Sequence, residues 1–161
     1  MKVFVINGAP GSGKTTFEEF IQEEYGDCAI ISTVDFVKTV AKFVGWDGTK
    51  TLKNRKFLSD LKDLLTQWED IPFINTIERC KEYEDTNYII FIDCREPDEI
   101  ERLCVALDAQ SIVMRRNEAE KMMTSNHADA NVLDYYYDII IDNNGTLNDL
   151  RDAAKTFLEN F

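Results

Sequence analysis

The chain has 161 residues, of which 44% are hydrophobic, so it can bury the core of one ordinary domain and is not globally disordered. Its 18 Lys and Arg residues against 30 Asp and Glu residues give a formal net charge of −12. Most of such a surface repels polyanions, which disfavours nucleic acids and anionic membranes as partners but is compatible with a small anionic substrate bound where cations gather.

Short apolar runs alternate with amphipathic helical patterns along the whole chain. The runs that predict buried strands are Val3–Ile6, Cys28–Ile31, Tyr88–Ile92, Ser111–Met114 and Ile139–Ile141. The helical patterns cover residues 17–25, 36–44, 57–68, 72–80, 97–107 and 146–161. Strands separated by helices indicate an α/β fold with a parallel sheet and right-handed crossovers.

Apolar spacing within the helices predicts which side chains face the core. The stripe of the 57–68 helix ends in Trp68, which we expect to be buried. Thr146 is expected to cap the last helix, whose buried stripe begins at Leu147 and ends at Phe161.

No apolar run approaches the ~18 residues of a membrane-spanning helix. The run Val3–Ile6 is also shorter than the ~7–15 apolar residues of a secretory signal, so we expect a cytoplasmic protein. The four cysteines show no C-x-x-C spacing and the chain has a single histidine, which disfavours a zinc site or a disulfide framework.

The segment between the first predicted strand and the first predicted helix reads GAPGSGKT and matches G-x-x-x-x-G-K-[ST] at every fixed position. Its glycines allow backbone N–H groups to form an anion-binding nest at a helix N-terminus. We predict that Lys14 reaches the β- and γ-phosphates of a nucleoside triphosphate and that Thr15 binds Mg²⁺. The predicted nucleotide-binding residues of this loop are Gly8, Ala9, Pro10, Gly11, Ser12, Gly13, Lys14, Thr15 and Thr16.

Asp93 follows a buried strand, where a second Mg²⁺ partner is expected. The chain has no N-K-x-D guanine motif, and Asp142-Asn143-Asn144 does not provide one. The turn that begins at Asp93 also lacks the glycine of a D-x-x-G switch. A small kinase therefore remains the favoured class of nucleotide-binding enzyme.

Basic residues gather at positions where a kinase could use them to bind phosphate. Five of them lie between Lys50 and Lys62 against one acid, Asp60, although a solvated helix face explains this cluster equally simply. Further arginines follow strand ends, where a guanidinium can bind a transferring phosphoryl group. The candidates for phosphate contact are Arg55, Arg95, Arg115 and Arg116.

Together, the GAPGSGKT unit, the Asp93-Cys94-Arg95 turn with Glu99, and the late stretch from Ser125-Asn126-His127 to Leu147 resemble the P-loop nucleoside-monophosphate-kinase superfamily. The likeness is greatest to the branch of phage deoxynucleoside monophosphate kinases and animal-type phosphomevalonate kinases.

This resemblance implies ATP and Mg²⁺ as the donor, and a single domain over 1–161 with a five-stranded parallel sheet, helices on both faces and a three-layer sandwich. It also implies a helical acceptor-binding insertion over about 36–86 and a short lid over 117–134. In that arrangement Arg95 joins the donor and acceptor sites, Arg115 and Arg116 open the lid, and Asn144 lies near adenine.

The acceptor is the open question. Asp35 follows the second predicted strand and could cap the helix that begins at Phe36, contact a substrate hydroxyl or sugar, or act as a general base. Trp46 lies in a glycine-flanked turn that we also assign to the acceptor site. The basic cluster favours a (deoxy)nucleoside monophosphate; the alternatives are a metabolite hydroxyl with Asp35 as base, and a non-kinase regulator or slow ATPase. We expect a monomer or homodimer.

Overall fold

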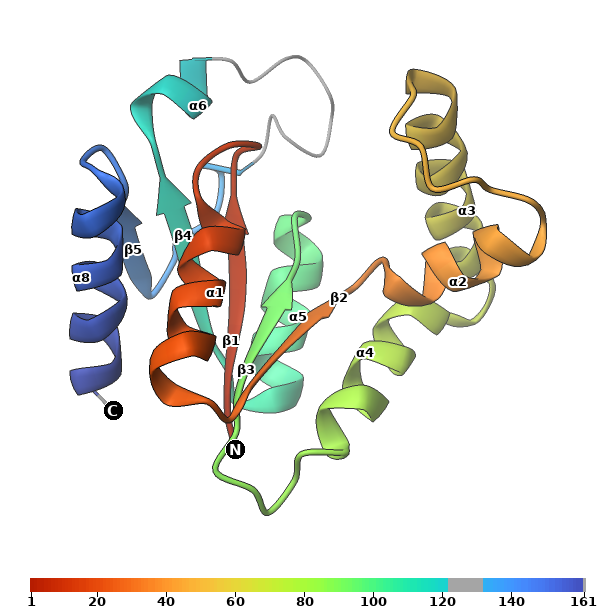
Figure 1. Cartoon of the computed structure of the whole chain (residues 1–161). Helices are drawn as coiled ribbons and strands as arrows, with labels where there is room; N and C mark the ends of the chain where they lie inside the picture. Colours follow the sequence, from red (N-terminus) through yellow and green to blue (C-terminus); the bar gives the residue numbers. More distant parts are fainter. Residues whose placement is uncertain (122–131, 161) are drawn as a thin grey trace. The chain divides into compact units, whose positions relative to one another are not determined.

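The computed structural model describes residues 1–121 and 132–160 (Figure 1). Its strands are β1 (Lys2–Gly8), β2 (Cys28–Ser32), β3 (Ile89–Asp93), β4 (Gln110–Arg115) and β5 (Ile139–Asp142). Its helices are α1 (Lys14–Tyr25), α2 (Asp35–Phe43), α3 (Leu52–Glu69), α4 (Ile71–Lys81), α5 (Pro97–Leu107), α6 (Asn117–Lys121) and α8 (Leu147–Glu159). The chain forms two compact units, one of residues 1–30 and 85–161 and the other of residues 31–84.

The first unit contains the sheet, apart from the last two residues of β2. The five strands lie in the order β2-β3-β1-β4-β5 and are parallel, as predicted. The central strand β1 pairs with β3 and β4, and β4 pairs with β5 at the edge. These strands are near-continuously apolar because helices cover both faces of the sheet.

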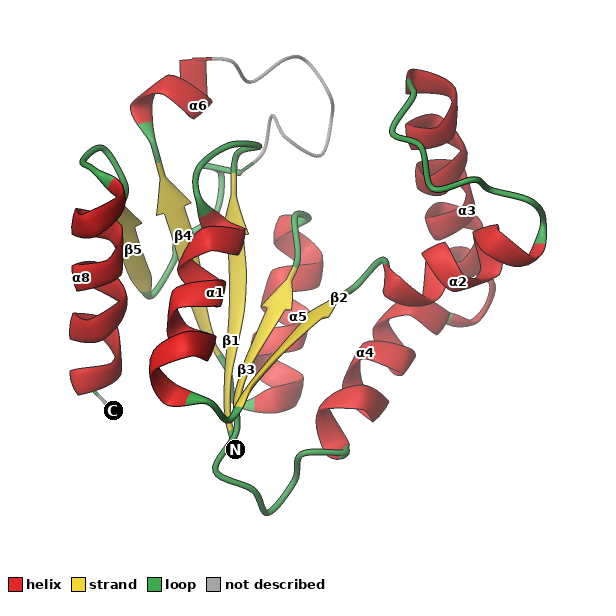
Figure 2. Ribbon diagram, viewed as in Figure 1, coloured by secondary structure: helices red, strands yellow, loops and turns green. Residues whose placement is uncertain are grey.

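Helices α1 and α8 lie side by side on one face of the sheet, and α5 covers the other face (Figure 2). On the α1 side, Phe4 of β1 packs against Phe91 of β3 and Phe157 of α8, with ring centroids 5.7 and 5.0 Å apart. Successive strand residues point to opposite faces, so Val5 and Ile92 turn to the α5 side and are fully buried there. Because helices pack on both faces, the strands are held in place and the residues at their carboxyl ends have fixed positions.

Local signals begin two helices where the sequence indicates. Thr146 and Asp149 form a reciprocal capping box at the start of α8, which confirms the predicted cap. Pro97 occupies the first turn of α5, where its missing N–H costs nothing. Leu147, however, is 63% exposed, so its predicted burial is wrong: the first turn of α8 projects past the core, and the buried face begins at Leu150.

The second unit is built from α2, α3 and α4, which contact one another. Val37 and Ala41 of α2 and Cys80 of α4 are completely buried. Helix α3 has no buried residue, and Trp68 is 72% exposed, so the predicted burial of Trp68 is wrong. Apolar spacing identifies the apolar face of a helix, but a unit of three helices has too few elements to cover it.

Within the described residues, no helix is both long enough and apolar enough to cross a membrane.

Substitutions of Phe17 and Trp68 test the assignment of one side chain to the buried core and of the other to the exposed surface. Phe17 is fully buried, and we expect Phe17→Ala to lower the free energy of unfolding by about 3–5 kcal/mol, since it leaves a cavity. Trp68→Ala removes an exposed ring and should change that free energy by about 0.5 kcal/mol or less. Urea denaturation followed by circular dichroism measures both, and equal losses would contradict the assigned environments.

Candidate active site

The loop between β1 and α1 has the backbone conformation that its glycines allow. Gly11 and Gly13 have φ angles of 85° and 95°, in the left-handed region that other residues adopt only with strain. The Ser12 N–H donates to the Ala9 carbonyl at 2.9 Å, which closes the turn. A Cβ atom on Gly11 would meet nothing within 4 Å, so the loop opens outward at that point.

Asn143, immediately after β5, holds the middle of the loop. Its Nδ2 donates to the Ser12 carbonyl at 2.8 Å, and its backbone N–H donates to the Arg115 carbonyl at 2.8 Å. Its side chain also lies where a Cβ on Gly13 would point, which explains why glycine is required there. Sequence reasoning named only the neighbouring Asn144, as a residue near adenine; its Oδ1 accepts from the Asn117 N–H at 2.9 Å.

Asn7 holds the start of the loop and was also missed. It is fully buried, and its Oδ1 accepts from the Gly8 N–H at 2.8 Å. Its Nδ2 donates to the Tyr137 hydroxyl at 2.8 Å and to the Arg95 carbonyl at 3.2 Å. Tyr137 in turn donates to the Val132 carbonyl at 2.9 Å, and burial raises the pKa of its phenol to about 12. The signal available in the sequence was a polar asparagine at the end of an apolar run, directly before the first loop glycine.

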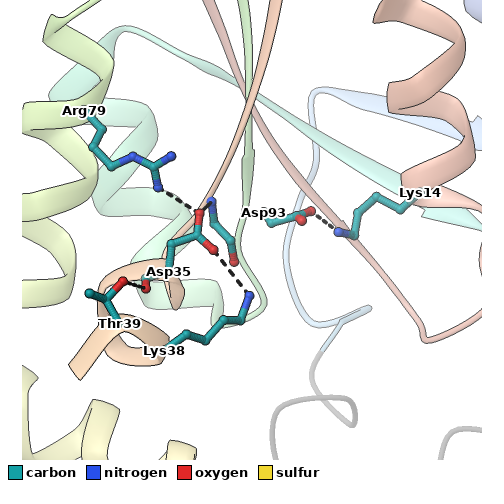
Figure 3. Close-up of polar contacts among 7 residues, drawn as sticks. Lys14, Asp35, Lys38, Thr39, Arg79 and Asp93 are labelled. Atoms are coloured by element: carbon teal, nitrogen blue, oxygen red, sulfur yellow. Dashed lines mark hydrogen bonds and ion pairs between the residues drawn. The ribbon is translucent and has the colours of Figure 1, made fainter. Parts of the chain in front are cut away.

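Lys14 and Asp93, both predicted site residues, form an ion pair between α1 and the end of β3 (Figure 3). Thr15 is exposed in the first turn of α1. Mg²⁺ in nucleotide sites takes one or two protein oxygens and draws the rest from water and phosphate, which suits a hydroxyl and a carboxylate here. The described residues contain no cluster of three or more His, Cys, Asp or Glu side chains able to hold a metal without such help.

Two further observations fit a bound phosphate chain. Ser12 Oγ is buried and has no hydrogen-bond partner among the described residues, although buried polar atoms are nearly always paired. Beside the loop lies a pocket of about 220 Å³. It is lined by Gly13, Thr16, Arg116, Asn143, Gly145, Thr146, Leu147 and Leu150.

The remaining predicted arginines of this unit differ in their surroundings. Arg115 ends β4 and donates to both oxygens of Glu120, at 2.9 and 3.0 Å, which raises the pKa of its guanidinium. Arg116 lies 3.4 Å from a Glu118 oxygen and lines the pocket beside the loop. Arg95 is exposed in the turn after β3. Residues 122–131 of the predicted lid, His127 among them, lie outside the described residues.

In the second unit, Asp35 lies among cations (Figure 3). Its Oδ2 accepts from Arg79 Nη1 at 2.8 Å and from the Ser32 N–H at 3.0 Å, and its Oδ1 lies 3.3 Å from Lys38 Nζ. Burial alone would raise the pKa of this carboxyl, but the hydrogen bonds from Arg79 and Ser32, with the charge of Lys38, lower it below its usual value.

The interpretation of Asp35 as a helix cap is wrong. Helix α2 begins at Asp35 itself, its N-cap residue is Val34, and no side chain caps it. Asp35 therefore stands inside the first turn, from which its carboxylate reaches back to Ser32 and across to α4. Arg79 was missed because its partner is 44 residues away in the sequence, and helical spacing gives no sign of such a pair.

The same residues line a pocket of about 480 Å³ between α2 and α4. Three cations and one carboxylate give its lining a formal charge of +2. The lining consists of Asp35, Phe36, Lys38, Thr39, Lys42, Asn75 and Arg79. Arg55 and Trp46, both predicted to bind the acceptor, do not line it. Arg55 is exposed on α3, and the buried Nε1 of Trp46 has no hydrogen-bond partner in the described part of the chain.

Searches against models of protein families and against curated proteins found no match. Solved structures do match the whole chain. Shikimate kinase from Aquifex aeolicus has a TM-score of 0.59 at 13% identity, over 99% of this chain and 97% of its own. Dephospho-CoA kinase from Campylobacter jejuni has a TM-score of 0.56 at 18% identity, over 99% and 96%. A sugar kinase from Janibacter sp. has a TM-score of 0.55 at 15% identity, over 99% and 95%.

The chain has the fold of the P-loop kinases. Identities this low establish the fold alone, so what the chain binds must be argued from its own residues.

Asn143 and Asn144, which follow β5, allow a matched test of the hydrogen bond by which Asn143 holds the loop. Asn143→Ala leaves the buried Ser12 carbonyl without its donor, and we expect the free energy of unfolding to fall by about 1–3 kcal/mol. Asn144→Ala removes an exposed acceptor and should cost about 0.5 kcal/mol or less. Urea denaturation gives both values, and faster amide exchange in residues 8–13 should accompany the first change alone.

Proposed function

We propose that this protein transfers the terminal phosphoryl group of Mg-ATP to a small anionic acceptor, with a (deoxy)nucleoside monophosphate as the leading candidate. The observation that carries the proposal is the glycine-rich loop at the junction of β1 and α1, with Lys14 beside Asp93 and a buried Ser12 hydroxyl that no described residue binds. Backbone N–H groups, a helix N-terminus and a lysine together form a binding site for a triphosphate.

On the donor side, each part of the nucleotide has a matching group. The loop amides, Lys14 and Ser12 would bind the phosphates, and Thr15 with Asp93 would hold Mg²⁺. When bound, the ion neutralises charge on the phosphate oxygens. The pocket beside the loop, with Thr16 and Arg116 in its lining, would take the nucleoside. Asn144 and Arg115 stay predictions for the adenine and transferring-phosphate contacts.

On the acceptor side, the pocket between α2 and α4 supports an anion. Its formal charge of +2 matches the charge of a phosphate monoester, about −2 at neutral pH. Arg79 can bind phosphate through its fork of N–H donors, and the exposed ammonium of Lys42 is the second candidate contact. A phosphate acceptor is already an anionic nucleophile, so it needs these cations more than it needs a base.

Asp35 supports a second candidate, phosphorylation of a hydroxyl group. A carboxylate in a cationic pocket can accept a hydrogen bond from an alcohol and orient it. Its lowered pKa makes it a weak proton acceptor, so we assign it orientation of a sugar or alcohol hydroxyl in preference to general-base catalysis. The third hypothesis is a nucleotide-binding regulator or slow ATPase.

A panel of acceptors separates the three functions. Mg-ATP consumption is followed by a coupled assay with each (deoxy)nucleoside monophosphate and with neutral and carboxylic metabolites. Stimulation by a monophosphate supports the leading candidate, and stimulation only by alcohols or hydroxy acids supports the second. Binding of Mg-ATP with no stimulated turnover would leave the regulator or slow ATPase.

Lys14→Ala tests the donor site. Because the lysine charge stabilises the transferring phosphoryl group, we expect ATP turnover to fall roughly 100-fold or more while the circular dichroism spectrum stays unchanged. Lys155→Ala, which removes an exposed lysine of α8, serves as the control and should retain full turnover. Full activity in the Lys14 variant would refute the donor assignment.

Changes in the pocket of the second unit test the acceptor. Lys42→Ala should raise the KM for the stimulating acceptor about tenfold and leave the KM for ATP unchanged, since one charge-assisted contact is lost. Asp35→Asn should lower kcat less than tenfold if Asp35 orients a hydroxyl. A loss of about 10²–10⁴ in kcat at unchanged KM would instead identify Asp35 as the base.

A further inference from the structure

Glu18 is a buried acid that the proposed chemistry does not use. It lies on α1, is 1% exposed, and its Oε1 has no hydrogen-bond partner among the described residues. Glutamate is almost never buried to this degree unless it is paired, because removing a carboxylate from water is costly. Ser12 Oγ and Glu18 Oε1 are both buried atoms that no described residue binds. Ser12 belongs to the proposed phosphate loop, residues 8–15, and Glu18 to α1, the helix that follows it.

The charged and titratable groups that act on Glu18 are few. Burial raises the pKa of its carboxyl to about 7; Lys14, one turn earlier on α1, opposes this shift, and Glu19 adds to it. From β2, the Cys28 thiol faces the same region, and burial together with Glu18 raises its pKa to about 12. That thiol is neutral at physiological pH, and Lys14 supplies a cationic charge that acts on Glu18.

The net charge beside the loop therefore depends on whether the Glu18 carboxyl is protonated. Lys14 already pairs with Asp93, so these two groups together carry no net charge. An ionised Glu18 adds −1 about 6 Å further along the helix axis, whereas a protonated Glu18 adds none. A phosphate chain that binds at the helix N-terminus brings further negative charge toward this carboxylate, which favours its neutral form.

We propose that Glu18 takes up a proton from solvent when a nucleotide binds at the phosphate loop, and that this uptake couples nucleotide affinity to pH. The inference rests on the proposed nucleotide site. The step is a protonation only: the proton comes from the buffer, forms an O–H bond on the Glu18 carboxylate, and no other bond changes. By linkage, the proton strengthens nucleotide binding by the same factor by which the nucleotide strengthens proton binding.

Calorimetry with a non-hydrolysable ATP analogue and saturating Mg²⁺ tests this coupling. Titrations at pH 7 in buffers with different ionisation enthalpies give the number of protons taken up. For the wild type we expect up to roughly half a proton per nucleotide, because a group that titrates near 7 is already half protonated there. Glu18→Gln should abolish this uptake, whereas Glu19→Gln, its exposed neighbour with the same charge, should retain it.

The pH dependence of wild-type binding provides a second measurement that does not rely on a variant. Affinity should fall as the pH rises from 6 to 8.5, and the infrared band of a protonated carboxyl should grow when the nucleotide is added at pH 7.5. An affinity independent of pH, or equal proton uptake in the wild type and a folded Glu18→Gln variant, would overturn the inference. Absence of any nucleotide binding would instead refute the proposed function itself.

Discussion

Parallel pairing of the central strands is the constraint on which the glycine-rich loop between β1 and α1 depends. In the register of the sheet, Ile6 pairs with Asp93 and Gly8 pairs with Met114, so β1, β3 and β4 end at the same edge. The loop leaves β1 at that edge, and groups from the neighbouring strands reach it without long connections. Asp93 meets Lys14, and Asn143, just past the end of β5, binds the Ser12 carbonyl. A shift of one residue in any pairing would remove one of these supports.

The distribution of charge matters more than its total. A chain with a net charge of −12 would repel most anions, yet it keeps cations at two defined places. In the first unit, Lys14 stands at a helix N-terminus and is neutralised by Asp93. In the second, Arg79 and Lys38 are partly neutralised by Asp35. At both places a carboxylate of the chain holds the cations in position, and an anionic ligand would have to compete with it.

Much of the fold could be read from local pattern, and the failures have a common cause. The strands, the position of the GAPGSGKT loop between a strand and a helix, and the Thr146 cap each depend on a few neighbouring residues, and each was predicted correctly. Trp68 was predicted to be buried because its spacing is that of an apolar helix face, but burial depends on whether another element covers that face. Arg79 and Asn143 were missed because each acts on a residue far away in the sequence.

By itself, the sequence determined the position of the glycine-rich loop and the parallel α/β fold, because glycine conformation, strand hydrophobicity and helix capping act over a few residues. Only the tertiary structure decided which groups hold that loop, which cations gather around Asp35, and that Glu18 Oε1 is buried without a hydrogen-bond partner among the described residues. Each of these depends on how strands and helices distant in sequence meet. Local patterns do not encode such meetings, because a side chain's charge and hydrogen bonding are set by whatever packing brings next to it.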